Sequence, residues 1–223
     1  MKLVHPALQM KMEFIENQVI IWEIESPAVF RKYLEELWSQ SNGQEGKFVL
    51  SADDLQEMEF HKNVELILSP FEVDVNDKKY LNKIYAELKQ LAFEEKYYLQ
   101  TQQLCSSISR YLLELEQDIS IHLTYEKEID FGQIIKSSGI KIEDEPRLLG
   151  KLVQYLQVAA YLMKKRVIIF VGLSMYLEEE EREELLKHAF YLKLYVILLE
   201  QQEISCTSSY KRYIIDKDEC EIF

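Results

Sequence analysis

The stretch Arg166-Val167-Ile168-Ile169-Phe170-Val171 is the part of the sequence that decides the fold. Its five consecutive apolar residues are mostly β-branched, which is typical of a strand buried on both faces of a parallel sheet. A similar run occupies residues 194–199, and apolar residues at helical spacing fill 148–163 before the first run and 177–191 between the two. Strands that alternate with helices in this way predict an α/β protein with a mostly parallel sheet covered by helices.

The N-terminal part of the chain extends this pattern. Ser26 followed by Pro27 predicts the start of a helix, because serine caps a helix and proline fits its first turn. Runs rich in β-branched and aromatic residues predict further strands, and the last of them is expected at the edge of the sheet. These expected strands are 14–15, 19–24, 48–50, 64–68, 119–125, 140–142 and, at the edge, 213–215.

A long segment without glycine or proline lies between Pro70 and Gly132. Its apolar residues recur at steps of three and four, which predicts one very long helix or two stacked helices. Any break is expected in the polar stretch 94–103. We therefore predict a helical leg domain at 76–118, inserted into an α/β head domain formed by 1–75 and 119–223.

Composition excludes several classes of protein. The 26 basic and 39 acidic residues give a net charge of −13, which excludes a protein that coats nucleic acid through overall basicity. No stretch has the roughly 20 apolar residues of a membrane span, and no secretory signal is recognisable. Three distant cysteines make a disulfide framework improbable, so we expect a cytoplasmic protein with no membrane contact.

Motifs for nucleotide hydrolysis and for common catalytic sites are absent from the sequence. There is no GxxxxGK[ST] and no GxGxxG, although parallel α/β sheets often bind nucleotides. Gly172-Leu173-Ser174 is not part of a GxSxG motif, because Tyr176 occupies the final position. The four histidines do not have the spacing of zinc ligands.

One acidic and one basic cluster remain. The span 112–130 has one base, Lys127, against six acids, a net of 1 − 6 = −5. The span 136–166 has seven bases against three acids, a net of 7 − 3 = +4. Clustered carboxylates favour a hard cation such as Ca²⁺, and clustered lysines favour phosphate groups. Solvated surfaces are the alternative interpretation of both clusters.

The C-terminal half resembles the small accessory protein of the subtype II-A CRISPR adaptation module. The resemblance is carried by residues 134–143, 152–162 and 164–171, with a weaker match at 71–76 before the long helical segment. It implies a homotetrameric ring whose subunits have a head distantly like nucleotide hydrolases, without the phosphate loop, and a helical leg. It also implies calcium-dependent binding of double-stranded DNA ends without sequence specificity, and no enzymatic activity. The implied partners in spacer acquisition are the CRISPR integrase and the large RNA-guided nuclease.

The resemblance also suggests residues for both sites. The implied calcium ligands are Glu116, Asp118, Glu126, Glu128 and Asp130. The implied DNA-binding residues are Lys136, Lys141, Lys151, Lys164 and Lys165. Two alternatives stay open, namely a metal-dependent nuclease that uses the carboxylates and a non-catalytic nucleotide-binding scaffold.

Overall fold

The computed structural model describes residues 1–54, 56–126 and 128–223, which divide into two compact units. The head unit comprises Met1–Val75 and Asp144–Phe223. The helical unit comprises Asn76–Glu143 and is thus an insertion into the head.

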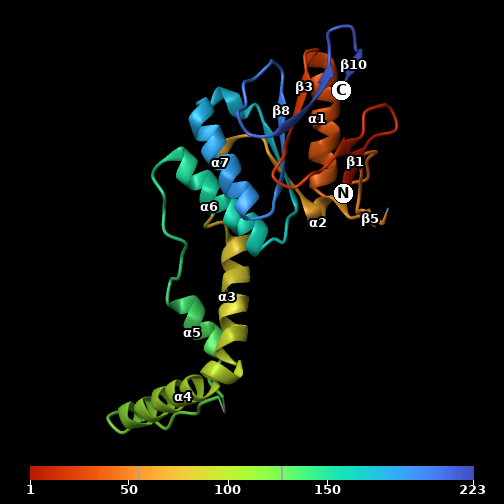
Figure 1. Cartoon of the computed structure of the whole chain (residues 1–223). Coiled ribbons are helices and arrows are strands. Elements are labelled where there is room, and N and C mark those ends of the chain that lie inside the picture. The colour runs from red at the N-terminus through yellow and green to blue at the C-terminus, as the bar shows by residue number, and fades with distance from the viewer. Residues whose placement is uncertain (55, 127) are drawn as a thin grey trace. The chain divides into compact units, whose positions relative to one another are not determined.

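A six-stranded sheet in the order β10-β9-β3-β8-β7-β6 forms the centre of the head unit (Figure 1). All of its strands are parallel except β10, which pairs antiparallel with β9. The strands are β3 (Val19–Ile24), β6 (Val64–Ile67), β7 (Val167–Val171), β8 (Tyr195–Glu200), β9 (Tyr210–Ile215) and β10 (Glu221–Ile222). The expected mixed α/β class is confirmed.

Helices and a small second sheet cover the two faces of this sheet (Figure 1). Helix α1 and the four-stranded antiparallel sheet β2-β1-β4-β5 lie on one face, and α6 and α7 lie on the other. The bounds are β1 (Lys2–Val4), β2 (Met12–Glu13), α1 (Pro27–Ser41), β4 (Val49–Ser51), β5 (Glu57–Met58), α2 (Phe60–Asn63), α6 (Leu148–Tyr161) and α7 (Glu179–Tyr191). Single 3-10 turns occupy Pro70–Glu72 and Leu173–Met175.

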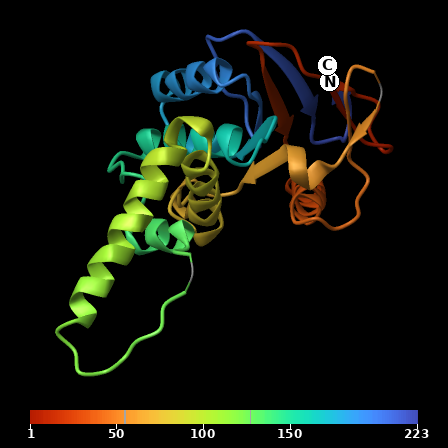
Figure 2. The ribbon, with the colours of Figure 1, turned by 90° about the horizontal axis from the view of Figure 1, so that it is seen from below.

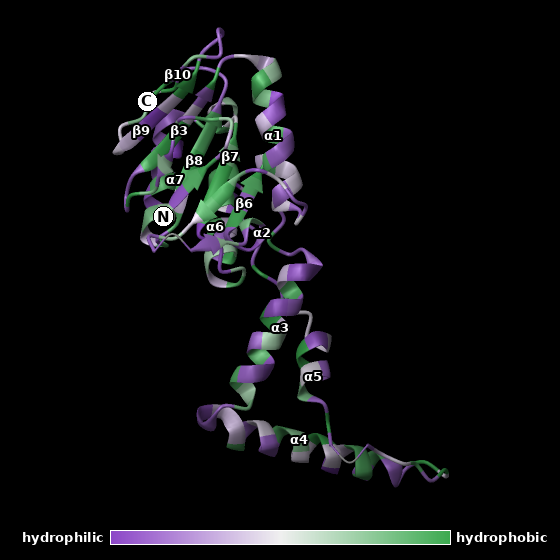
Figure 3. Cartoon of the chain, turned by 90° about the vertical axis from the view of Figure 1, so that its right-hand side faces the viewer, coloured by the Kyte–Doolittle hydropathy of each residue, from purple (hydrophilic) through white to green (hydrophobic). Residues whose placement is uncertain are grey.

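The alternation of side chains along β3 explains why both faces are covered. Ile20, Trp22 and Ile24 belong to the core cluster that includes residues of α1, whereas Ile21 points to the opposite face and is also fully buried. Figure 3 shows hydrophobic residues concentrated in β3, β7 and β8. Burying each large apolar side chain contributes about 1.5–3 kcal/mol, so this sheet provides most of the stability of the head.

The helical unit consists of α3 (Lys78–Ala92), α4 (Glu95–Glu116) and α5 (Phe131–Ser137). The Asp77 side chain caps α3 by accepting a hydrogen bond from the backbone N–H of Lys79 at 2.8 Å. The chain bends at Phe93 and Glu94, so α4 leaves α3 at a steep angle (Figures 2 and 3). Helix α5 packs beside α3, and the Tyr85 hydroxyl donates to the carbonyl of Ile140 at 3.0 Å.

The structure corrects several expected elements. Residues 119–125 and 140–142 do not form strands, and β9 lies inside the sheet because β10 continues it beyond the expected edge. Residues 14–15, expected as a strand, are not one, and the nearest strand, β2, ends at Glu13. Among the described residues, no helix is both long and apolar enough to cross a membrane.

The second domain boundary also differs from the expected one. Residues 119–143 group with the helical unit, whereas the sequence suggested that the head resumes at 119. The reason is packing within the helical unit, because α5 contacts α3 and the Asn76 side chain holds the backbone of Ile142. Asn76 donates to the Ile142 carbonyl at 2.9 Å and accepts from its N–H at 2.8 Å.

Candidate nucleic-acid interface

Exposed basic residues lie one to three residues before the starts of three neighbouring parallel strands of the head. Lys62 precedes β6, Lys164 and Arg166 precede β7, and Lys193 precedes β8. Val167 pairs with Tyr195 across β7 and β8, so Arg166 and Lys193 lie at the same edge on strands about 4.8 Å apart. The same edge carries Glu59, which forms an ion pair with Lys62 at 2.7 Å. We call Lys164, Arg166 and Lys193 the amino-edge cations.

Two amino-edge cations occupy left-handed backbone positions that follow a helix. Lys164 and Lys193 both have φ of 56°, where glycine or asparagine is more usual. After α7, the N–H of Leu194 donates to the carbonyl of Ala189 at 2.9 Å, which is the bond of a Schellman motif with Lys193 at its turn. Lysine at a helix C-terminus also interacts favourably with the helix dipole. The Lys164 ammonium lies 4.8 Å from the centroid of the exposed Tyr161 ring.

The opposite edge of the sheet is acidic. Glu23 is the second-last residue of β3 and Glu200 is the last residue of β8. The two residues are in register on neighbouring strands. Both are buried, at 4% and 3% exposed. Glu200 accepts hydrogen bonds from the N–H and hydroxyl of Ser174 at 3.0 and 2.7 Å. Burial raises the pKa of both carboxyl groups, and Arg212, 3.9 Å from Glu23, only partly offsets it there.

Helix α7 adds further acids at its first turn. Glu178 and Glu181 form a reciprocal capping box, so this acidic run has a structural role. Glu183 is buried, which disfavours its charge, but hydrogen bonds from Ser208 and Thr207 outweigh this effect and lower its pKa to about 2. The exposed acids at the start of α7, Glu178 and Glu180, would repel a phosphate backbone, whereas the amino-edge cations would attract it.

One predicted DNA-binding residue has a different role. Lys165 is 7% exposed and forms an ion pair with Glu65 at 3.0 Å. It also donates to the carbonyls of His61 and Val64 at 2.7 and 2.8 Å. Its ammonium group therefore joins β6 to the segment before β7 inside the head and does not reach a ligand.

The other four predicted lysines are exposed, and they are divided between the two units. Lys151 lies in the first turn of α6 and Lys164 follows its last turn, which separates them by about 20 Å at 1.5 Å per residue. Lys136 lies on α5 and Lys141 follows it, so both belong to the helical unit. The sequence interpretation did not select Arg166 or Lys193. Their signal was their position, one residue before each buried apolar run.

The predicted calcium ligands do not form one group of neighbouring side chains among the described residues. Asp130 caps α5 by accepting from the N–H of Gly132 at 2.9 Å, and it forms an ion pair with Lys89 at 2.9 Å. These two contacts, first Lys89 and then Gly132, lower its pKa. Glu116 accepts from the N–H of Leu123 at 2.9 Å. Asp118, Glu126 and Glu128 are exposed.

The fit to calcium is therefore poor in the described part of the chain. Within residues 1–54, 56–126 and 128–223, no three His, Cys, Asp or Glu side chains are grouped closely enough to hold a metal ion. The ion pair between Asp130 and Lys89 would have to break before that carboxylate could coordinate a cation.

Comparisons with known proteins point to one family. A family model described as CRISPR-associated protein (Cas_Csn2) matches residues 40–219. The chain is 30% identical over 151 residues to the CRISPR-associated protein Csn2 of Enterococcus faecalis, a match that spans 65% of each chain, just under two thirds. It is 27% identical over 169 residues to the Csn2 of Streptococcus agalactiae, or 74% of each chain. A putative ABC transporter ATP-binding protein from Pyrococcus furiosus aligns with 95% of this chain and 97% of its own, at 11% identity and a TM-score of 0.41.

Proposed function

The chain belongs to the Csn2 family of CRISPR-associated proteins, and from this premise we propose that it binds the ends of double-stranded DNA, without reading their sequence, in support of spacer acquisition. The observation that carries the proposal is the row of amino-edge cations at one end of the head sheet. Lysine and arginine side chains in such a row contact phosphates, which position DNA without specifying its bases. The exposed acids at the start of α7, Glu178 and Glu180, disfavour binding of the backbone at the opposite edge.

We propose that four subunits form a closed ring. The proposal is supported by α4, a helix of 22 residues that exposes many large apolar side chains. Residues at alternating steps of four and three form a continuous stripe along this helix, which is the spacing of a helix that packs against another helix. The stripe consists of Tyr97, Leu104, Ile108, Tyr111 and Leu115, and Thr101, which completes the spacing, is buried within its own chain and donates to the carbonyl of Ala92. A ring would let four sets of amino-edge cations act on one duplex, and it would admit DNA only at an end.

The partners and the lack of catalysis belong to the same proposal. We propose that the ring passes captured DNA to the CRISPR integrase and acts beside the large RNA-guided nuclease, without an enzymatic step of its own. Incubation of linear duplex with the protein and Mg²⁺ or Mn²⁺ tests the last point. Intact DNA is expected, and cleavage that is lost in a Glu116→Gln variant would support a nuclease instead.

Calcium binding by Glu116, Asp118, Glu126, Glu128 and Asp130 stays a prediction, and no step of the DNA-binding mechanism depends on it. Titration calorimetry with CaCl₂ on the assembled protein tests it. An Asp118→Asn and Glu128→Gln double variant should lose the binding heat if these residues are ligands. An unchanged heat would exclude them.

The DNA surface is tested with a variant in which Lys164, Arg166 and Lys193 are all changed to glutamine. Fluorescence anisotropy with two 30-base-pair duplexes of unrelated sequence would measure affinity between about 50 and 200 mM salt. We expect weaker binding to both duplexes, and a slope of log K against log salt that is shallower by about 2–3, because each lost phosphate contact removes nearly one unit.

The matched control is Lys217→Gln, an exposed lysine in the turn between β9 and β10. It removes one positive charge, as Lys164→Gln, Arg166→Gln and Lys193→Gln each do alone, but from a different part of the head, and it should leave the slope unchanged. A loss in this control equal to that in each of the three single variants would mean that only the net charge matters. The proposed surface would then be wrong.

The preference for ends needs a topological test. Linear DNA and covalently closed circular DNA of the same sequence are compared in a filter-retention assay at equal concentration. A ring that threads onto ends should retain the linear form and release the circular form. Equal retention of both forms would overturn the ring.

A further inference from the structure

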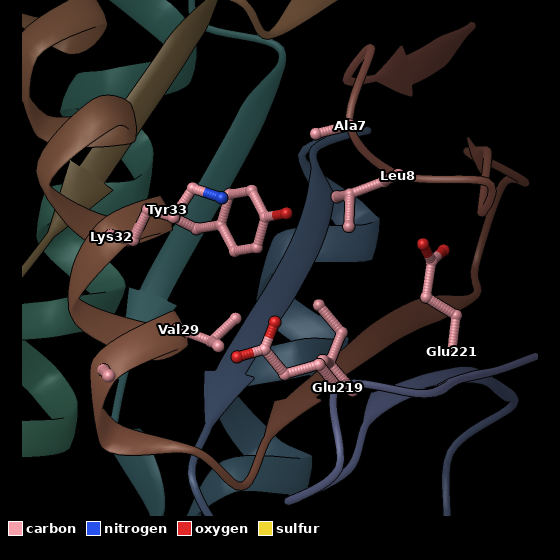
Figure 4. Close-up of a pocket in the computed structure, with 9 residues that line it drawn as sticks. Ala7, Leu8, Val29, Lys32, Tyr33, Glu219 and Glu221 are labelled. Carbon is pink, nitrogen blue, oxygen red and sulfur yellow. The ribbon is translucent and has the colours of Figure 1, made fainter.

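A pocket of about 300 Å³ lies in the head unit, and none of the amino-edge cations lines it (Figure 4). Its walls come from α1, from the end of β9 with the turn and strand that follow, and from the N-terminal segment around Ala7 and Leu8. Val29, Leu8 and Ile215 make part of the lining apolar. This volume is at the small end of the range of ligand pockets, so it suits a molecule of only a few heavy atoms.

The strongest sign of a ligand in this pocket is Tyr33. This residue is only 4% exposed, and Figure 4 shows its ring among the residues that line the pocket. Among the described residues, no hydrogen-bond partner is found for its hydroxyl group, whose oxygen is not enclosed by protein and is therefore open to the pocket. Burial, followed by Glu221, Glu36 and Glu219, raises the pKa of this hydroxyl, and a tyrosine hydroxyl can both donate and accept hydrogen bonds.

Glu219 is placed at the pocket by a constrained turn. Its backbone has φ of 62°, which is uncommon for a residue other than glycine and belongs to the hydrogen-bonded turn between β9 and β10. The Asp216 side chain holds this turn by accepting from the N–H groups of Asp218 and Cys220 at 2.9 and 2.8 Å. In the described part of the chain, the Glu219 carboxylate has neither a hydrogen bond nor an ion pair.

Charges of both signs line the pocket without neutralising each other. Glu221 accepts hydrogen bonds from the backbone N–H groups of Gln9 and Met10 at 2.9 and 2.8 Å, which fixes one wall. Lys32 extends over the ring of Tyr33, with its ammonium 5.1 Å from the ring centroid. Within the described residues, no ion pair joins Lys32 to Glu219 or Glu221. A ligand that carries both charges would satisfy these groups together.

We propose that this pocket binds a small zwitterion, namely a free α-amino acid with an apolar side chain. The Glu219 carboxylate and the Tyr33 hydroxyl receive the ammonium group of the ligand, and Lys32 binds its carboxylate. Val29, Ile215 and Leu8 contact its side chain. The proposal does not depend on DNA binding, because none of its residues belongs to the amino-edge cations.

Titration calorimetry with three probes of similar shape tests the proposal. L-Leucine carries both charges, leucinol lacks the carboxylate, and 4-methylpentanoate lacks the ammonium group. We expect leucine to bind with a Kd below about 1 mM and both analogues to bind at least about tenfold more weakly. Absence of leucine binding at this concentration, or equal binding of all three probes, would overturn the proposal.

Variants assign each charge to its partner. Lys32→Met should weaken the binding of leucine about tenfold and leave the binding of leucinol unchanged. Glu219→Gln should weaken the binding of leucine and leave the binding of 4-methylpentanoate unchanged. Tyr33→Phe removes only the hydroxyl group and should also weaken the binding of leucine. Lys217→Met is the control, at a position two residues from both Ile215 and Glu219 that does not line the pocket, and it should bind leucine as the unaltered protein does. Leucine affinities in the Lys32 and Glu219 variants equal to that of the control would exclude the proposed site.

Discussion

The head unit and the helical unit use their apolar residues in opposite ways. The head buries strands such as β7 and β8 almost completely, with Ile169 and Ile197 at 0% exposed. In the helical unit, α4 exposes Leu99 at 72% and Tyr111 at 59%, and Thr101 is its buried residue. The comparison teaches that the head has a core of its own, whereas the helical unit leaves an apolar surface that a partner subunit could cover.

The largest expected effect is a difference in the free energy of unfolding between a substitution in the core of the head and one on α4. Trp22→Ala in the head should lower the free energy of unfolding by about 3–5 kcal/mol, because it leaves a large cavity beside β3. Tyr111→Ala on α4 should change it by no more than about 0.5 kcal/mol in a dilute, dissociated sample. Urea unfolding followed by circular dichroism measures both.

Concentration provides the control for this comparison. The Tyr111 variant should become less stable than the unaltered protein only where the protein assembles, which sedimentation velocity can establish. A large loss for Tyr111→Ala in the monomer would mean that α4 is packed within its own chain, and the contrast would disappear.

The second expected effect lies within the head, at two adjacent lysines. Lys165→Met should lower the free energy of unfolding by about 1–3 kcal/mol, because Glu65 and two backbone carbonyls lose their donor. Lys164→Met should stay within about 0.5 kcal/mol of the unaltered protein, since its ammonium is exposed. Thermal unfolding by calorimetry compares the two. Equal losses would contradict the structural role of Lys165.

A smaller effect is expected at the start of the helical unit. Asp77→Ala removes the cap of α3 and should cost about 1 kcal/mol of local stability. Hydrogen exchange should then become faster in the first turn of α3 and stay unchanged in β7. Asp77→Ser, which can still cap the helix, should restore most of the protection. Faster exchange throughout the chain would show that the two units unfold together.

The smallest expected effect concerns the buried acids of the head. The folded pKa of Glu23 is raised by burial, with Arg212 opposing it and Glu203, Glu25 and Glu200 adding to it. Its contribution to stability is therefore complete below the unfolded value of 4.5 and is lost as the pH rises through the folded pKa. Glu23→Gln should reduce the loss of stability between pH 5 and pH 8 by no more than about 1 kcal/mol.

The measurement is urea unfolding at several pH values in that window. Glu16→Gln, at an exposed position, is the control and should follow the unaltered protein. Identical pH profiles for the Glu23 variant and the control would refute the assignment.

The sequence predicted the buried strands of the head well, because continuous apolar runs such as 167–171 have few alternatives. It also located the break between α3 and α4 at the start of the expected polar stretch. Residues 119–125 alternate in the same way as a strand, but a strand needs a neighbour to pair with, and alternation does not show whether one exists. The small sheet β2-β1-β4-β5 was not expected as a unit, because its strands have only two or three residues.

The candidate interface was only partly predictable for a similar reason. Lys164 and Lys165 are neighbours in the sequence, yet one ammonium is exposed and the other is buried beside Glu65. Nothing in the local pattern distinguishes them, since the distinction depends on β6, about a hundred residues earlier. Asp130 lies in an acidic stretch of sequence, which suggested a metal ligand. Its ion-pair partner, Lys89, is distant in sequence, so the local pattern does not reveal this pairing.

During synthesis on the ribosome, β3 emerges long before the two strands that flank it. Its neighbours β8 and β9 begin at Tyr195 and Tyr210, after the whole helical insertion. At 5–20 residues per second, the nascent β3 waits on the order of ten seconds with both of its backbone edges unpaired. An apolar strand in that state is prone to aggregate, so a chaperone that shields residues 19–24 should raise the yield of native protein more than one that acts on α3 or α4.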